Sequence, residues 1–93
     1  MTKSERSKVT ARILIEIGAV NFSLLSPFKL SSGFLSPSYI DCRKIIAYPS
    51  AFDSITDMMI DAIKSDMISQ SPNYIIGGET AGIPFAAVIA QKM

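Results

Sequence analysis

The chain has 93 residues and a formal net charge of +1, and 48% of its residues are hydrophobic while 18% are charged. A near-neutral charge lacks the basic excess of nucleic-acid-binding domains, and no apolar run approaches the roughly 18 residues that a membrane span requires. We therefore expect one small domain that has neither a nucleic-acid nor a membrane partner.

Cysteine and histidine usage narrows the chemistry further. Cys42 is the only cysteine, which excludes an internal disulfide and fits a reducing cytoplasm. The sequence has no histidine, which removes the most common general base and the most common zinc ligand. Without a histidine to activate it, Cys42 is a poor candidate nucleophile. We expect no catalytic and no metal-ligating side chain in this chain.

The first element is a helix predicted over residues 4–17. Thr2 and Glu5 are three residues apart, as in a capping box, where a hydroxyl and a carboxylate satisfy free amides at a helix start. Gly18 stands where the end of a helix favours a left-handed residue. The apolar positions that recur at helical spacing are Val9, Ile13, Leu14 and Ile17.

Residues 19–48 have a different character, because prolines, serines and a glycine separate short apolar pieces. Alternating polar and apolar residues over 28–30 and 38–42 predict two half-buried strands. The sequence Ser-Ser-Gly at 31–33 is typical of a turn. We expect these two strands to pair as a hairpin.

A second helix is predicted over residues 49–69, because Pro49 suits a first helical position and apolar residues follow at helical spacing. Ser-Pro-Asn at 71–73 breaks it. Residues 74–77 predict a short buried strand, and residues 84–93 a third helix. The order helix, strand, turn, helix is typical of a parallel α/β sheet, whose strands need neighbours. We therefore expect the front portion of a larger α/β protein.

Three carboxylates, Asp53, Asp57 and Asp61, follow one another at a spacing of four residues in the 49–69 helix. Such a row is compatible with a divalent metal. However, it lies opposite the apolar stripe, and Lys64 follows three residues after Asp61. We interpret the row as a solvated helix face.

Residues 77–82, GGETAG, connect the predicted strand to the last helix. Small residues leave backbone N–H groups accessible, and a helix start carries about half a positive charge, so the turn suits a phosphate or pyrophosphate. Its spacing matches neither the lysine-containing phosphate loop nor the dinucleotide-binding glycine pattern. From the pattern alone, an ordinary tight turn is the more frequent structure.

A second candidate segment is residues 31–44, SSGFLSPSYIDCRK. Tyr39 can stack on a planar ring, and Arg43 can hold a carboxylate or phosphate with two hydrogen bonds. The alternative, and on spacing alone the more frequent one, is a surface hairpin with routine charges.

These two segments resemble orotate phosphoribosyltransferases. Residues 28–44 are similar to the family's N-terminal hood, with the pattern F-x-L-x-S-G-x-x-S-P-x-Y-x-D-x-R, and residues 77–84, GGETAGIP, to its turn after the first core strand. The motifs occur in the family's order. The resemblance implies an α/β fold in which a hood of one helix and short antiparallel strands (1–48) leads into the start of a parallel-sheet phosphoribosyltransferase core (49–93), a single incomplete domain.

The resemblance implies transfer of a phosphoribosyl group from phosphoribosyl pyrophosphate to orotate, giving orotidine monophosphate and pyrophosphate in pyrimidine biosynthesis. It implies Mg²⁺ bound with phosphoribosyl pyrophosphate, and a cytoplasmic homodimer. The residues that it places at the pyrophosphate are Glu79, Thr80, Ala81 and Gly82. The residues near the orotate are Ser31, Tyr39 and Ile40, to which we add Arg43 for its chemistry.

The sequence departs from the family at two points. Many members carry a lysine where Ser31 stands, and a serine cannot supply that charge. The family's phosphate-binding loop with paired acids and its basic mobile loop are not among these residues. We therefore expect the N-terminal part of the enzyme, inactive alone. The alternative is a non-catalytic module that binds an anion or another subunit.

Overall fold

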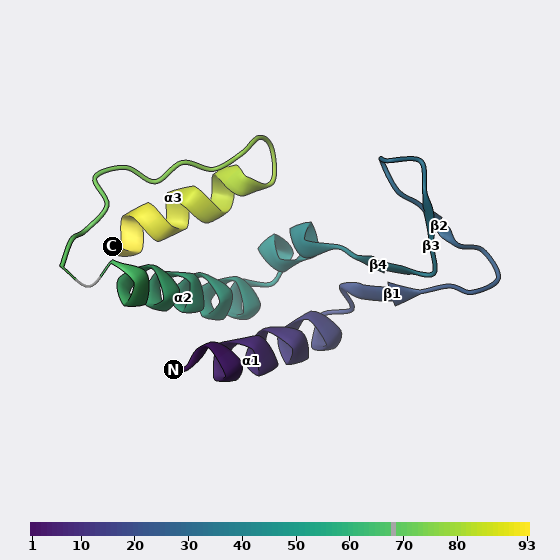
Figure 1. Ribbon diagram of the computed structural model, residues 1–93, viewed down its shortest axis with the longest axis horizontal. Helices are drawn as coiled ribbons and strands as arrows, with labels where there is room; N and C mark the ends of the chain where they lie inside the picture. The colour runs from purple at the N-terminus through teal and green to yellow at the C-terminus, as the bar shows by residue number, and fades with distance from the viewer. Residues whose placement is uncertain (68) are drawn as a thin grey trace.

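The computed structural model describes residues 1–67 and 69–93. Three helices lie at one end of an elongated molecule, and short strands form the other end (Figure 1). The principal extents are 50 × 27 × 23 Å. None of the helices in the described part of the chain has both the length and the apolar composition needed to cross a membrane. The elements, in order, are α1 (Lys3–Glu16), β1 (Val20–Phe22), β2 (Phe28–Lys29), β3 (Leu35–Ser36), β4 (Ser38–Ile40), the 3-10 helix η1 (Cys42–Ala47), α2 (Pro49–Asp66) and α3 (Gly82–Lys92).

Both ends of α1 follow from local sequence. Thr2 is the N-cap residue: its hydroxyl accepts a hydrogen bond from the Glu5 amide at 3.1 Å, and its own amide donates to the Glu5 carboxylate at 3.3 Å. The predicted capping box is therefore confirmed. Gly18 has a φ of +73°, and the Ala19 amide donates to the Leu14 carbonyl at 2.9 Å. A left-handed glycine thus ends the helix, as predicted.

The prediction that residues 28–30 and 38–42 pair as a hairpin is wrong, because each of these segments pairs with a different strand. β2 pairs with β3, in the register Phe28↔Ser36, and β1 pairs with β4, in the register Asn21↔Tyr39. The reason is the tightness of the turn at 31–33, where Gly33 has a φ of +91° and donates its amide to the Leu30 carbonyl at 2.9 Å. Such a turn places the residues immediately after it, not those farther along, beside β2.

The predicted strand also extended too far. β4 ends at Ile40, and the chain then turns into η1, so Asp41 and Cys42 do not belong to a strand. The Asp41 amide still donates to the Ala19 carbonyl at 2.8 Å, and the Lys44 amide donates to the Asp41 carbonyl at 3.2 Å. Asp41 is therefore the residue at which sheet pairing gives way to helical turns.

The core lies where α2 meets α1 and η1. α2 begins at Pro49, as predicted, and ends at Asp66 rather than at Ser69; position 68 of that prediction lies outside the described residues. The buried centre consists of Ile45, Ile55 and Met58. The side chains that pack around it are Val9, Ile13, Leu14, Ile17, Phe52 and Phe85. α2 is thus the central helix, and both α1 and α3 pack against it (Figure 1).

The predicted strand at residues 74–77 is not formed. This segment is an irregular connection, in which Tyr74 is 85% and Ile76 is 91% exposed. A parallel strand exists only when a neighbour completes its hydrogen bonds, and the described residues supply no such neighbour. α3 begins at Gly82, two residues before the predicted start. Pro84 is then the third helical residue, where its missing N–H removes no intrahelical bond.

The row of carboxylates on α2 is exposed but not merely solvated. Arg6 of α1 donates a hydrogen bond to Asp61 at 2.9 Å. Lys92 of α3 donates to Asp53 at 2.7 Å and to Asp57 at 2.9 Å. The row therefore links α2 to both neighbouring helices, which the interpretation as a solvated face missed.

Candidate functional site

The residues assigned to orotate come from three neighbouring segments. Ser31 lies in the β2–β3 turn, Tyr39 and Ile40 lie in β4, and Arg43 lies in η1. The Tyr39 ring packs against Phe28 of β2, with ring centroids 5.9 Å apart and an interplanar angle of 35°. Tyr39 is 37% exposed, so part of its ring is available for a ligand.

Tyr39 and Ile40 do not present their side chains to the same space. Successive residues of a strand point to opposite faces. Ile40 accordingly lines an apolar groove between the sheet and α1, together with Leu14, Val20 and Phe22. A planar ring stacked on Tyr39 would therefore meet only the main chain of Ile40.

Asp41, which forms an ion pair with Arg43, is absent from the site residues predicted from the sequence. Arg43 is 70% exposed, and its Nε lies 3.6 Å from Oδ1 of Asp41. This carboxylate oxygen is buried and accepts no hydrogen bond from the described residues. A buried acceptor without a hydrogen bond is costly, and the positive charge of Arg43 offsets part of that cost. The position of Asp41 between Tyr39 and Arg43, in the pattern Tyr-x-Asp-x-Arg, is the sequence feature that could have identified it.

The turn before α3 offers fewer free amides than expected. The Gly82 amide donates to the Gly78 carbonyl at 2.9 Å, and the Ile83 amide lies 3.4 Å from the Thr80 carbonyl. The amides of Thr80 and Ala81 make no hydrogen bond within the described part of the chain. The Glu79–Thr80 peptide bond is cis. Of the Thr80, Ala81 and Gly82 amides, those of Thr80 and Ala81 are therefore free to donate, at the start of an 11-residue helix.

Gly77 is the glycine on which the turn depends most closely. A Cβ atom at Gly77 would overlap the Gly82 carbonyl oxygen and lie 2.9 Å from the Ala86 Cβ. A Cβ at Gly82 would lie 3.3 Å from the Gly77 carbonyl carbon, whereas one at Gly78 would meet nothing within 4 Å. In the sequence, Gly77 is distinguished only as a member of the glycine run. Its role depends on a contact across the turn that no local pattern indicates.

α3 directs this turn toward the strands. The start of α3 is the end of that helix nearest to β1–β4 along the long axis of the molecule, and its last residue lies at the far end (Figure 1). The positive end of the helix dipole thus faces the part of the molecule that carries Tyr39 and Arg43. The two motifs are oriented toward one another, although they are separated in sequence.

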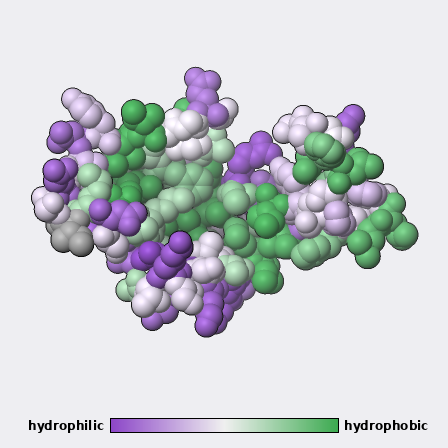
Figure 2. Space-filling model, viewed as in Figure 1, coloured by the Kyte–Doolittle hydropathy of each residue, from purple (hydrophilic) through white to green (hydrophobic). Residues whose placement is uncertain are grey.

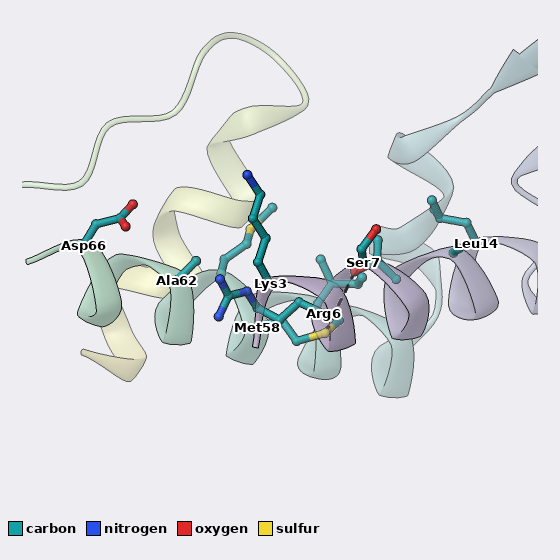
Figure 3. A pocket seen from close by; sticks show the side chains of 11 residues that line it. Lys3, Arg6, Ser7, Leu14, Met58, Ala62 and Asp66 are labelled. Carbon is teal, nitrogen blue, oxygen red and sulfur yellow. Dashed lines mark hydrogen bonds between the residues drawn. The ribbon is translucent and has the colours of Figure 1, made fainter. Parts of the chain in front are cut away.

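A separate groove lies between α1 and α2 and has a volume of about 670 Å³. Its lining includes Lys3 and Arg6 of α1 and Met58, Ala62 and Asp66 of α2 (Figure 3). It contains none of the residues of the two motifs. We therefore place the candidate site at the turn and the strands, not in this groove.

Comparisons with known proteins agree with the motifs. No family model matches the chain. It is 47% identical over 89 residues to an orotate phosphoribosyltransferase of Roseobacter denitrificans, covering 96% of this chain and 40% of that protein. It is 46% identical to an orotate phosphoribosyltransferase of a Ruegeria species, with coverage of 96% and 39%.

Two solved structures share the fold. Orotate phosphoribosyltransferase from Aeropyrum pernix superposes with a TM-score of 0.71 at 32% identity, covering 89% of this chain and 47% of that one. UMP synthase from Leishmania donovani superposes with a TM-score of 0.76 at 28% identity, covering 94% of this chain and 18% of that one.

These similarities confirm the resemblance and the fold class predicted from the sequence. The chain spans about 40% of the length of the curated relatives that it matches. The division between residues 1–48 and 49–93, and the roles of individual site residues, stay predictions.

Proposed function

We propose that this chain is the N-terminal part of an orotate phosphoribosyltransferase, a glycosyltransferase that moves a phosphoribosyl group from phosphoribosyl pyrophosphate to a ring nitrogen of orotate. The observation that carries the proposal is the 47% identity, over 96% of the chain, to a protein of that name. The two motifs support it because they supply complementary chemistry, an anion-binding turn and an aromatic surface.

The turn at residues 79–82 would bind the pyrophosphate group. Negative charge develops on the leaving pyrophosphate, so fixed N–H donors that face it lower the barrier. The free amides of Thr80 and Ala81, together with the dipole of α3, suit this purpose. Gly82 contributes by its small size rather than by its amide, which the Gly78 carbonyl occupies.

Mg²⁺ is part of the proposal as the ion bound with phosphoribosyl pyrophosphate. Magnesium in proteins is commonly held by one or two carboxylates, water and substrate phosphates. Glu79 is an exposed carboxylate beside the free amides, and it makes no ion pair with another described residue. It therefore fits as an acceptor of hydrogen bonds from metal-bound water or from ribose hydroxyls. The bound ion would neutralise charge on the leaving group.

The strands would bind orotate. The half-exposed ring of Tyr39 offers a flat surface, and the guanidinium of Arg43 has donors free for the orotate carboxylate. The hydroxyl of Ser31 adds a neutral hydrogen-bonding group at the β2–β3 turn. Ile40 would contribute its main chain, since its side chain lies on the opposite face of the strand.

A cytoplasmic homodimer completes the proposal. Large apolar side chains are exposed around the strands, where hydrophobic residues gather on the surface (Figure 2). They are Phe22, Leu24, Leu25, Phe34 and Leu35. Exposed apolar surface of this kind marks contacts with other protein segments or subunits. The single thiol fits a reducing compartment.

The test is turnover by the complete protein that contains residues 1–93. With orotate, phosphoribosyl pyrophosphate and Mg²⁺, we expect orotidine monophosphate and pyrophosphate in equal amounts. Uracil in place of orotate is the matched control, because it lacks the carboxylate that Arg43 would bind. A folded complete protein that binds pyrophosphate but forms no nucleotide would favour the non-catalytic module instead.

A further inference from the structure

Lys92, in the last turn of α3, is the centre of a polar cluster outside both motifs. Its ammonium group lies within hydrogen-bonding distance of four oxygen atoms of α2. These are the Asp53 carboxylate at 2.7 Å, the Thr56 hydroxyl at 2.8 Å, the Asp57 carboxylate at 2.9 Å and the Asp53 carbonyl at 3.1 Å. An ammonium group has three N–H donors, so every donor has a partner.

The cluster is anchored in the core by Thr56, which is fully buried. The Thr56 hydroxyl accepts from Lys92 and donates toward the Phe52 carbonyl at 2.8 Å. Isolated surface ion pairs contribute little, but a network with short distances and a buried member holds its geometry better. The hydrogen bonds that Lys92 donates to Asp53 and then to Asp57 raise the pKa of Lys92, because they favour its charged form.

α3 has few other attachments to the rest of the molecule. Among its residues, all of which are described, only Ile89 is buried. Near its start, Phe85 packs edge-to-face on Phe52 of α2, with ring centroids 5.1 Å apart. The helix is thus held near its start by the aromatic contact, in its middle by Ile89 and in its last turn by the Lys92 cluster.

Of these three attachments, Phe85 and Lys92 are the outermost, so their contacts determine the direction of the helix. At 1.5 Å per residue, Lys92 lies about 10 Å beyond Phe85, and Gly82 lies about 4.5 Å before it. If α3 pivots on Phe85, a shift of about 2 Å at Lys92 moves Gly82 by about 1 Å. A misplacement of about 1 Å in a binding group can change a rate by roughly 100-fold.

We infer that Lys92 is a positioning residue: by fastening the last turn of α3 to Asp53, Thr56 and Asp57, it sets the direction in which the 79–82 turn presents its amides. The inference rests on the proposed function of that turn. It assigns Lys92 no contact with substrate, because the length of the helix separates the two.

The experiment compares steady-state kinetics of the complete wild-type protein and its Lys92→Met variant. We expect the KM for phosphoribosyl pyrophosphate to rise about tenfold, with the KM for orotate within about twofold of wild type. Lys8→Met is the matched control for loss of one positive charge: Lys8 is exposed on α1 and forms no ion pair within the described residues. It should leave both KM values unchanged.

Two further variants separate positioning from general destabilisation. Lys92→Arg keeps the charge and the donors and should restore most of the affinity for phosphoribosyl pyrophosphate. Thr56→Val keeps the shape of the buried residue but removes one acceptor, and it should raise the same KM by a smaller factor. Equal losses for both substrates, or no rescue by arginine, would show that Lys92 only stabilises the fold.

The outcomes also distinguish this inference from the proposed function. Wild-type turnover together with an unchanged KM in Lys92→Met would overturn the positioning role and leave the proposed function standing. Absence of wild-type turnover with orotate would overturn the proposed function, and the positioning role with it.

Discussion

At the scale of single residues, three glycines of one turn have three different roles. Gly77 is needed because its α-carbon lies against the Gly82 backbone and Ala86 of α3. Gly82 is close to the same contact from the other side, and Gly78 is open to solvent. A glycine-rich segment therefore does not have one uniform reason for its composition.

Gly77→Ala should destabilise the protein. The added methyl group would overlap the Gly82 carbonyl, and overpacking of this kind typically costs about 1–3 kcal/mol. The measurement is the free energy of unfolding in urea for the complete protein. Gly78→Ala is the control, since its methyl group would meet nothing within 4 Å, and it should change stability by less than about 0.5 kcal/mol. Equal effects of the two variants would contradict the assigned contact.

Gly82→Val should weaken binding of phosphoribosyl pyrophosphate by about 1–3 kcal/mol, the scale of a buried charged contact left unmade. A side chain here starts 3.3 Å from the Gly77 carbonyl carbon and would crowd the anion beside the free amides. Calorimetric titration with Mg²⁺ and phosphoribosyl pyrophosphate measures the change, after a thermal melt has shown that the variant folds. Unchanged affinity in a folded variant would show that the glycine at position 82 serves packing and not anion binding.

At the scale of elements, α1 and α3 are joined to α2 in different ways. α1 has its own cap at Thr2, packs apolar side chains on α2, and adds the Arg6–Asp61 ion pair. α3 has no side-chain cap and depends on Phe85, Ile89 and Lys92. Its attachment is therefore the more sensitive of the two to charge.

Alkaline pH should weaken the attachment of α3. Asp53 and Asp57 raise the folded-state pKa of Lys92 above 10.5, so its stabilising contribution is fully present below pH 10.5 and is lost as pH rises through the folded-state pKa. The difference in unfolding free energy between wild type and Lys92→Met should thus be constant near neutral pH and shrink above it. The other lysines and the tyrosines titrate in both proteins, so their contributions to the unfolding free energy cancel in this difference. A difference in unfolding free energy that grows with pH would contradict a stabilising role for the Lys92 cluster.

At the scale of the whole molecule, much apolar surface is exposed for so small a protein. Leu25 is 100% exposed, and the segment at 74–77 carries exposed Tyr74 and Ile76 without a partner strand. The helices share a small core around Ile45 and Met58, and the strands extend away from it (Figure 1). These surfaces suit contacts with further protein segments or subunits.

The 93-residue chain alone should show no transferase activity. It spans about 40% of the enzymes it resembles and lacks the paired-acid loop and the basic loop expected of the family. Purified chain mixed with orotate, phosphoribosyl pyrophosphate and Mg²⁺ should give no orotidine monophosphate, and it should self-associate in sedimentation experiments. The complete protein is the positive control, and turnover by the isolated chain would contradict this expectation.

The sequence by itself determined the features that depend on neighbouring residues. The capping box of Thr2 and Glu5, the left-handed Gly18 and the helix start at Pro49 involve residues at most a few positions apart, so local patterns indicate them. The same holds for the two motifs that identify the candidate site.

Only the tertiary structure decided which strands pair, which face of β4 carries Tyr39, and what holds α3. β1 meets β4 across about twenty residues of chain, and Lys92 reaches Asp53 across a separation of 39 residues. The unformed strand at 74–77 belongs with these, because a strand exists through its neighbours and not through its own residues. Contacts between distant segments depend on packing of the whole chain, which a local pattern does not contain.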